Sequence, residues 1–261
     1  MTLHHVEHGS GTPVLLLHGY TIDHRLLLPL ESVFAARDGW RRLYVDLPGS
    51  GESPRLDGAV TADAMGDAVS RFVDTAIGDE PFAVVGISYG GQLARHLVAE
   101  RGTQVLGTAL IAPLVKPSGA RIVPERQVLT HDEALLASLD QADRDIFAGI
   151  AVHQTEAGWQ AFRDYVLPGI RAHHREDAAA LLKAYMLSKT PEDVFGTHHG
   201  RHLLVTGRQD HLVGWRDQLE LLAHYPRMTY AAVDGAGHNV HLDQPALVHG
   251  RLAGWLDSID G

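Results

Sequence analysis

A Gly-x-Ser-x-Gly motif is the feature of this sequence with the clearest chemical potential. Residues 86–90 read Gly-Ile-Ser-Tyr-Gly, with an apolar run before them and a helical pattern after them. A serine in a tight strand-to-helix turn has a strained backbone that exposes its hydroxyl above the sheet. Gly86 and Gly90 leave room for the strand and helix to pass closely, and the helix N-terminus favours negative charge beside the serine. The motif predicts that Ser88 is a nucleophile.

A serine hydroxyl is a poor nucleophile at neutral pH and needs a neighbouring base. The chain has 18 histidines, so a histidine alone carries little information. His238 differs because it ends a Gly-Ala-Gly-His loop between an expected strand and a terminal helix that begins near Gln244. We predict that His238 is the general base, and His241, three residues further on, is the local alternative.

Asp210 is the predicted acid that orients the base. It follows an expected strand in the run Gly-Arg-Gln-Asp, although an aspartate in a turn often only caps a helix. Its role would be to hold the imidazole of His238 in the productive tautomer and to stabilise the imidazolium. The order Ser88, Asp210, His238, each just beyond a strand, favours this role over capping.

These residues need a parallel sheet to bring them together, because the carboxyl ends of parallel strands meet at one edge. Short continuous apolar runs alternate with helical patterns, which is typical of an α/β fold with a mostly parallel sheet covered by helices on both faces. The expected strands are Pro13–Leu17, Arg42–Val45, Phe82–Ile87, Leu106–Ala112, Leu203–Thr206 and Met228–Val233, with early helices at Leu27–Ala36 and Ala62–Ile77.

The alternation stops after Pro113. Residues 114–199 contain no convincing strand and are expected to be helical, with Thr130 and Glu133 at capping-box spacing and Thr190 before Pro191 at a helix start. We interpret residues 114–199 as a helical cap inserted into a core formed by residues 1–113 and 200–261.

Composition limits the partners. The 261 residues include 32 acidic and 22 basic side chains, for a formal net charge of −10, which disfavours nucleic acids and anionic membranes as partners. There is no cysteine, so disulfides and thiolate sites are excluded. No apolar run is long enough to span a bilayer and no secretory signal is evident. We expect a soluble cytoplasmic protein that acts on a small molecule; a homodimer is left open.

With these motifs the sequence resembles the α/β-hydrolase superfamily from about Val14 to Trp255. His18-Gly19-Tyr20 is similar to the family's oxyanion loop, and residues 46–53 are similar to its Asp-x-x-Gly-x-Gly-x-Ser turn. The resemblance implies an oxyanion hole built from the backbone N–H groups of Tyr20 and Tyr89. It also implies a helical cap between the sixth strand and the acid turn. His18 and Asp46 are interpreted as structural.

The resemblance implies a carboxylesterase-like serine hydrolase that cleaves a small ester, thioester, lactone or amide through an acyl-enzyme, without cofactor or metal. Two other classes stay open. The first is enzymes that use the same triad for other reactions: perhydrolases or haloperoxidases, carbon–carbon hydrolases and lyases. The second is small-molecule receptors with slow turnover. Apolar residues of the cap are expected to roof the pocket, and no cationic cluster is evident among them, so we expect uncharged substrates. These apolar residues are Phe147, Trp159, Phe162, Tyr165, Leu181, Leu182, Tyr185 and Met186.

Several other histidines lie close together in the sequence. His198, His199 and His202 lie close to Asp193, but no His-Glu-x-x-His pattern accompanies them, and we interpret them as exposed side chains rather than a metal site. His4, His5 and His8 are expected on an edge strand.

Overall fold

A seven-stranded sheet forms the centre of the protein in the computed structural model, which describes residues 2–259. The strand order is β1-β3-β2-β4-β5-β8-β9, and every neighbouring pair is parallel except β1 with β3. The strands are β1 (His5–Gly9), β2 (Thr12–Leu17), β3 (Trp40–Val45), β4 (Phe82–Ile87), β5 (Val105–Ile111), β8 (Arg201–Gly207) and β9 (Met228–Val233). The predicted fold class is confirmed. His5 and His8 lie on the antiparallel edge strand as expected, whereas His4 lies one residue before its start.

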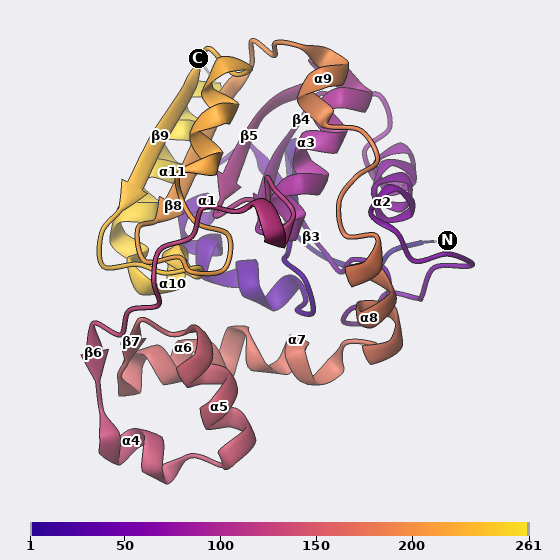
Figure 1. Cartoon of the computed structure of the whole chain (residues 1–261). Helices are drawn as coiled ribbons and strands as arrows, with labels where there is room; N and C mark the ends of the chain where they lie inside the picture. The colour runs from indigo at the N-terminus through magenta and orange to yellow at the C-terminus, as the bar shows by residue number, and fades with distance from the viewer. Residues whose placement is uncertain (1, 260–261) are drawn as a thin grey trace.

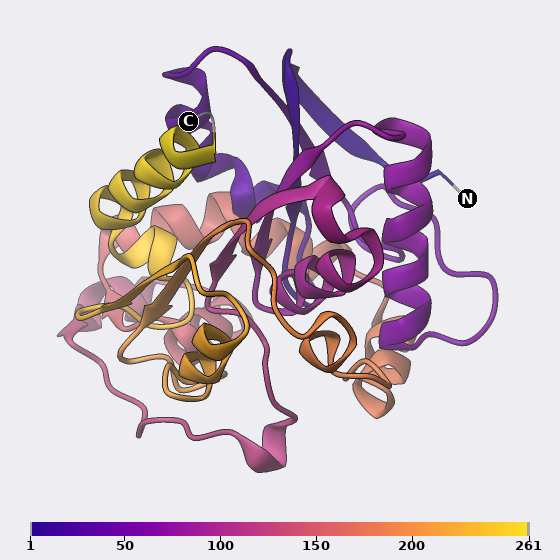
Figure 2. The same cartoon turned by 90° about the horizontal axis from the view of Figure 1, so that it is seen from above.

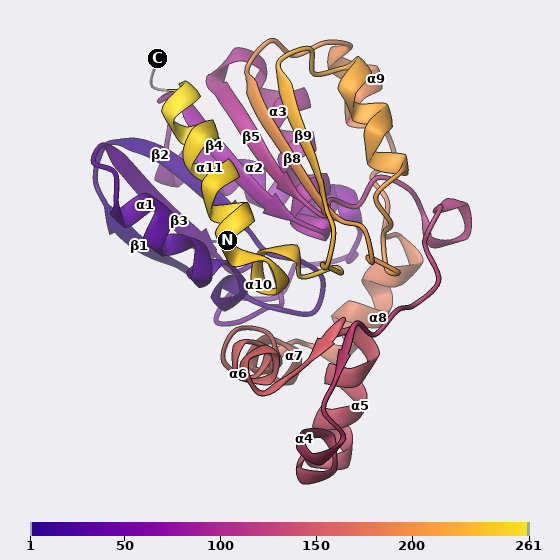
Figure 3. The same cartoon turned by 90° about the vertical axis from the view of Figure 1, so that its left-hand side faces the viewer.

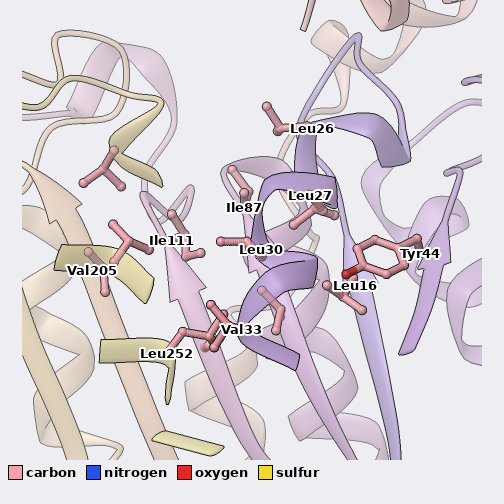
Figure 4. Close-up of a cluster of buried hydrophobic side chains, with 14 of the residues drawn as sticks. Leu16, Leu26, Leu27, Leu30, Val33, Tyr44, Ile87, Ile111, Val205 and Leu252 are labelled. Atoms are coloured by element: carbon pink, nitrogen blue, oxygen red, sulfur yellow. The ribbon is translucent and has the colours of Figure 1, made fainter. Parts of the chain in front are cut away.

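Both faces of the sheet are buried at its inner strands β2, β4, β5 and β8, which explains why these strands read as largely continuous apolar runs. Successive residues of a strand point to opposite faces. Leu16 accordingly belongs with Leu27, Leu30 and Leu252 to the apolar cluster on one face (Figure 4). Leu15 belongs to the cluster on the other face. The sheet is thus the middle layer of a three-layer core.

Helices on the two faces complete these layers. Viewed from above, α2 and α3 lie on one side of the sheet and α11 on the other (Figure 2). Their bounds are α2 (Ala62–Ala76), α3 (Tyr89–Arg101), α9 (Pro191–Phe195), α10 (Val240–Asp243) and α11 (Pro245–Ile259). The expected early helix at Leu27–Ala36 is two elements, the 3₁₀ helix η1 (His24–Leu30) and α1 (Glu31–Ala35). Two further 3₁₀ turns, η2 (Gly102–Gln104) and η4 (Asp217–Ala223), lie in the connections of the core.

The segment between β5 and β8 leaves the sheet at the carboxyl ends of the strands. Helices α4 to α7 lie together below the sheet, and α8 leads back toward α2 (Figures 1 and 3). Their bounds are α4 (Glu133–Ser138), α5 (Gln141–Ile150), α6 (Glu156–Tyr165), α7 (Leu167–Ala172) and α8 (Arg175–Lys183), with a 3₁₀ turn η3 (Ser118–Ala120) before them. No helix within residues 2–259 is long and apolar enough to cross a membrane.

Two details of this segment differ from the sequence-based expectation. A short parallel ladder joins β6 (Thr130–His131) to β7 (His153–Gln154) where only helices were expected. The N-cap of α4 is Asp132, whose side chain accepts the N–H of Leu135, so the predicted capping box at Thr130 is wrong. Strands of two residues are too short to show a periodic pattern in the sequence. Asp132, two positions after Thr130, accepts the free N–H at the start of α4 in its place.

Candidate active site

Ser88 lies in the turn between β4 and α3 with a strained backbone. Its φ is 53° and its ψ −114°, a conformation that L-residues rarely adopt, and its side chain is 8% exposed. Among the described residues, the other non-glycine residues with positive φ are Thr21 and Ala112. Thr21 lines the same cavity as Ser88, and Ala112 directly follows β5, whose last residue Ile111 accepts the N–H of Ser88. Such strain persists where the surrounding structure imposes it, and it often marks a functional site.

The glycines of the motif are required by close backbone contacts. A Cβ at Gly90 would lie 2.1 Å from the carbonyl oxygen of Leu17, and one at Gly86 would lie 2.5 Å from the carbonyl oxygen of Gly90. The strand, the turn and the neighbouring strand β2 therefore pack backbone against backbone. This packing fixes the position of Ser88 at the carboxyl edge of the sheet.

His238 and Asp210 form a hydrogen-bonded pair at the same edge. Nδ1 of His238 donates to Oδ2 of Asp210 at 2.9 Å, with the histidine side chain 14% exposed and the aspartate fully buried. Asp210 lies in the turn after β8, and His238 lies in the loop between β9 and α10. His238 and Ser88 both line one cavity. Because Nδ1 of His238 is bonded to Asp210, Nε2 is the ring nitrogen that remains available.

His241 occupies a different environment. It is fully buried, its Nε2 donates to the carbonyl oxygen of Leu26 at 3.0 Å, and burial lowers its pKa to about 4. His241 does not line the cavity that contains Ser88. A neutral imidazole that braces η1 from inside the core fits a structural role, so the geometry favours His238 over this alternative.

Asp243 is a second carboxyl group close to His238, and it is half-buried. Its Oδ2 accepts the N–H of Gly237 at 2.8 Å, and burial raises its pKa to about 6. The contact fixes the backbone just before His238 rather than the imidazole itself. Asp243 could not be recognised from the sequence, since an aspartate before the terminal helix reads as a helix cap.

The loop after β2 lies against Ser88. A Cβ at Gly19 would lie 3.3 Å from the Cβ of Ser88, so the backbone of residues 19–20 passes close to the serine. No acceptor within the described residues takes the N–H of Tyr20, and Tyr89 is the first residue of α3, where N–H groups have no intrahelical partner. The predicted oxyanion donors are therefore available, on either side of Ser88.

His18 braces this loop. It is fully buried, and its Nε2 accepts the N–H of Leu47 at 2.9 Å, which leaves the proton on Nδ1 to donate to the carbonyl oxygen of Gly19 at 2.7 Å. Burial lowers the pKa of His18, in keeping with this neutral tautomer. The contacts match the structural role predicted for it.

A cavity of about 620 Å³ lies above Ser88 and His238. The core contributes the residues around the serine, and the segment after β5 contributes an apolar roof. The roof residues are Ile150, Val166, Ile170, Leu182, Tyr185 and Met186. The ring of Tyr185 stacks on Tyr89 with centroids 5.0 Å apart, so the roof rests directly on the start of α3.

The prediction of the roof residues was therefore correct for only some of them. Leu182, Tyr185 and Met186 line the cavity, whereas Phe147, Trp159 and Phe162 pack on one another in the apolar layer that contains η1 and α10. Tyr165 does not line the cavity, and Leu181 lines a small neighbouring one. The aromatic face of α6 is buried against the core, so helical periodicity identified a buried face without identifying what covers it.

The expectation that no cation lies at the pocket is wrong. Arg121 and Lys183 both line the cavity. Arg121 lies in the irregular segment after β5, and Lys183 is the last residue of α8. Neither residue belongs to a periodic pattern that points at the cavity, so their position could not be predicted from the sequence.

Asp46 organises a cluster at the edge of the sheet. Its carboxylate accepts from Nδ1 of His4 at 2.7 Å, from Nδ1 of His24 at 2.8 Å and from the N–H of Glu52 at 3.1 Å. The three side chains His4, His24 and Asp46 are close enough to hold a metal ion, as are those of Asp67, His96 and Glu100. The hydrogen bonds account for the first cluster without a metal, in agreement with a structural role for Asp46.

The histidines near Asp193 are not an exposed tract. His198 and His202 are buried, and their rings are joined by a 2.9 Å contact between Nδ1 of His198 and Nε2 of His202. His202 also contacts Thr108 on the neighbouring strand β5. Only His199 is exposed. The group packs the base of α9 onto the sheet.

Comparison with known proteins agrees with this architecture. Lipase LipV of Mycobacterium tuberculosis is 37% identical over 147 residues, which are 54% of this chain and 51% of that protein. A 2-succinyl-6-hydroxy-2,4-cyclohexadiene-1-carboxylate synthase of Salmonella typhimurium is 28% identical over 270 residues, covering 97% of this chain and 98% of that enzyme. An alpha/beta superfamily hydrolase from Oenococcus oeni has the same fold, with a TM-score of 0.89, 22% identity and full coverage of both chains. A profile described as the alpha/beta hydrolase family matches residues 14–251, and this chain belongs to that family.

Proposed function

We propose that this protein is a serine hydrolase that cleaves a small ester, thioester, lactone or amide through an acyl-enzyme. Ser88 is the nucleophile, His238 the general base and Asp210 the acid that orients it. The observation that carries the proposal is the arrangement at one cavity: Ser88 in a strained turn, and His238, which is held by Asp210 at 2.9 Å, in the same wall.

The chemistry follows from these positions. His238 takes the proton of the Ser88 hydroxyl at Nε2 while Oγ attacks the substrate carbonyl, and Asp210 stabilises the imidazolium that forms. The N–H groups of Tyr20 and Tyr89 donate to the oxyanion, and the N-terminus of α3 adds a favourable dipole. His238 then returns the proton to the leaving group, and water releases the acyl group by the same steps.

Substrate selection falls to the helical cap, residues 114–199, over a core of residues 1–113 and 200–261. Most of the cavity roof comes from this segment, and pockets of this kind are apolar with a few polar groups that fix orientation. A cytoplasmic location and a reaction without cofactor or metal stay predictions from the sequence.

The direct test is covalent labelling with a fluorophosphonate, followed by mapping of the modified residue. We expect the label on Ser88, and Ser88→Ala should lose turnover of p-nitrophenyl butyrate by up to about a millionfold, as for other triad nucleophiles. Circular dichroism should show a folded variant. Labelling of another residue, or a variant that retains a tenth of the activity, would refute the assignment.

A second candidate uses the same three residues for a reaction other than the hydrolysis of an ester, thioester, lactone or amide, as in perhydrolases, carbon–carbon hydrolases or lyases. It is favoured by one observation: the relative from Salmonella typhimurium that matches over nearly the whole chain is named a synthase. A burst of p-nitrophenol with butyrate esters supports acyl transfer, whereas peroxide-dependent halogenation in acetate buffer supports perhydrolysis. Tight ligand binding with hardly any turnover would instead indicate a receptor.

A further inference from the structure

The cavity above Ser88 has an unusual charge. Arg121 and Lys183 line it, and among the residues that the structure describes no aspartate or glutamate does. The whole chain has the opposite balance, with 32 acidic and 22 basic side chains. The wall of this cavity is therefore a cationic region in an acidic protein.

Arg121 is held in place by the backbone around the acid turn. Its Nε donates to the carbonyl oxygen of Lys116 at 2.8 Å, and its Nη1 donates to that of Leu212 at 2.9 Å. Leu212 lies two residues after Asp210, and its own N–H donates to Oδ1 of that aspartate. The guanidinium is thus fixed to the turn that orients His238.

The neighbouring backbone is also anchored. The N–H of Ile122 donates to Oδ2 of Asp217 at 2.8 Å, and Asp217 is buried. A side chain held in this way loses little entropy when it binds a ligand, so its hydrogen bonds contribute more fully to affinity. Arg121 is preorganised, although it belongs to a segment without regular structure.

The charge of Arg121 has no counter-ion in the described part of the chain. No ion pair between residues 2 and 259 involves Arg121, and its Nη2 donates to no acceptor there. Arg95 and Arg55, by contrast, each form two hydrogen bonds to a carboxylate. Guanidinium groups bind carboxylates through paired N–H donors, and the interaction is strong where water is partly excluded.

We propose that the cavity binds a substrate that carries a carboxylate remote from the scissile carbonyl, and that Arg121 binds that carboxylate. The inference rests on the proposed acyl transfer at Ser88. Lys183 is exposed at the end of α8 and adds a longer-range attraction that steers the anion toward the cavity. The apolar roof contacts the chain between the two polar ends of the substrate.

Two substrates of equal length test the proposal: p-nitrophenyl hydrogen adipate, which ends in a carboxylate, and p-nitrophenyl hexanoate, which ends in a methyl group. We expect kcat/KM to be higher for the adipate ester. Arg121→Gln should lower the adipate-to-hexanoate ratio by about 10- to 100-fold, the range expected for a charge-assisted hydrogen bond. Arg121→Lys keeps the charge without the paired donors and should lower the ratio less.

Arg126→Gln is the matched control, because Arg126 is exposed on the same segment and does not line the cavity. It should leave the ratio unchanged. Lys183→Gln should lower the ratio a few-fold at low salt, and this effect should disappear at about 1 M salt, where charges are screened within a few ångströms. A preference of the wild type for hexanoate, or a ratio unchanged in Arg121→Gln, would overturn the proposal.

Binding separates this proposal from the hydrolase assignment. Calorimetry should show the adipate ester binding to Ser88→Ala about 10- to 100-fold more tightly than to Ser88→Ala/Arg121→Gln. That result together with a wild type that hydrolyses no ester would keep the anion site and reject the hydrolase. Equal binding to both variants in an enzyme that hydrolyses hexanoate would reject only the anion site.

Discussion

Both carboxylate oxygens of Asp210 are engaged, and they are engaged differently. Oδ2 accepts from His238, while Oδ1 accepts the N–H groups of Leu212 and Val213 at 2.9 and 3.0 Å. One residue thus orients the proposed base and closes the turn that presents it. The contacts of a turn-capping aspartate are present here together with the contact that the proposed triad requires.

This geometry predicts the effect of Asp210→Asn. The single amide oxygen should keep the two backbone N–H groups, so the amide NH₂ would face His238. The imidazole must then accept at Nδ1 and carry its proton on Nε2, where it cannot take the proton of Ser88. We expect a folded protein whose kcat for p-nitrophenyl butyrate falls by roughly 10⁴-fold. Asp243→Asn, at the half-buried carboxyl group near His238, should lose less than tenfold in kcat. Similar losses in both variants would contradict this assignment.

The two histidines of the loop make a second residue-scale prediction. His238→Ala should abolish esterase activity without lowering the melting temperature appreciably, because its side chain reaches the cavity surface. His241→Ala removes a fully buried ring and its bond to Leu26, so it should lower stability and affect activity mainly through the fold. Thermal melts and kinetics on both variants check the pair. An active His238→Ala together with an inactive, stable His241→Ala would exchange their roles.

Local sequence predicted Ser88, Asp210 and His238 because each follows a strand and lies beside glycine or a turn residue. Arg121 could not be predicted in the same way. Its position depends on the path of an irregular segment and on contacts with Leu212, which is 91 residues away in sequence. A contact of this kind exists only once the segment has packed, and no spacing or periodicity records it.

At the scale of elements, a buried ion pair joins α3 to α9. Nε of Arg95 donates to Oε1 of Glu192 at 2.6 Å and Nη2 to Oε2 at 2.5 Å, with both side chains 3% exposed. Burial alone would raise the pKa of Glu192, but the bonds to Arg95 hold that pKa below its ordinary value. Nη1 of Arg95 also donates to the carbonyl oxygen of Leu114.

Removing one partner should leave an uncompensated buried charge. Glu192→Ala is expected to destabilise the protein by about 3–5 kcal/mol, which corresponds to a fall in melting temperature on the order of 10 °C for a domain of this size. Arg95→Met/Glu192→Leu should recover a large part of the loss because it removes both charges. Asp164→Ala, at an ion pair that is half exposed, should leave the melting temperature unchanged. An equal effect at the two sites would contradict a special role for the buried pair.

The elements themselves were predictable where a single physical signal dominated. Continuous apolar runs identified β4 and β9 to the residue because both ends of each strand coincide with a change in polarity. The ladder of β6 with β7 could not be predicted, since its two pairs are Thr130 with His153 and His131 with Gln154, all polar or ambivalent residues. Their pairing follows from where α4 and α5 place the chain.

At the scale of the whole molecule, buried ionisable groups set the dependence of stability on pH. Burial lowers the pKa of His18, that of His202 to about 3 and that of His241 to about 4, while burial raises the pKa of Asp243 to about 6. Between pH 6 and pH 5 the unfolded chain binds protons on His202 and His241, which the folded chain leaves mainly neutral, and the lowered pKa of His18 acts in the same direction. Asp243 acts in the opposite direction, since its folded form holds the extra proton.

The net difference favours the unfolded state as the pH falls. The free energy of unfolding should decrease by roughly 1–3 kcal/mol per pH unit over this window, from about one to two protons in excess on the unfolded chain. Denaturant melts at pH 6.5, 5.5 and 4.5 measure the slope. His202→Gln should reduce the slope of the free energy of unfolding against pH by the contribution of about one proton. His199→Gln, at an exposed neighbour, should leave the slope unchanged. A stability that is flat or rises toward pH 4.5 would be incompatible with neutral buried histidines.

Arg95 contacts both ends of the segment that covers the cavity, Leu114 where the chain leaves β5 and Glu192 shortly before it returns to β8. The two ends are therefore held together by a single side chain of the core, and the length of chain between them hardly affects how they meet. Closing a longer loop costs only about 0.6 kcal/mol for each doubling of its length. An insertion anchored in this way can be lengthened, shortened or exchanged between relatives during evolution while the sheet and the serine turn stay as they are.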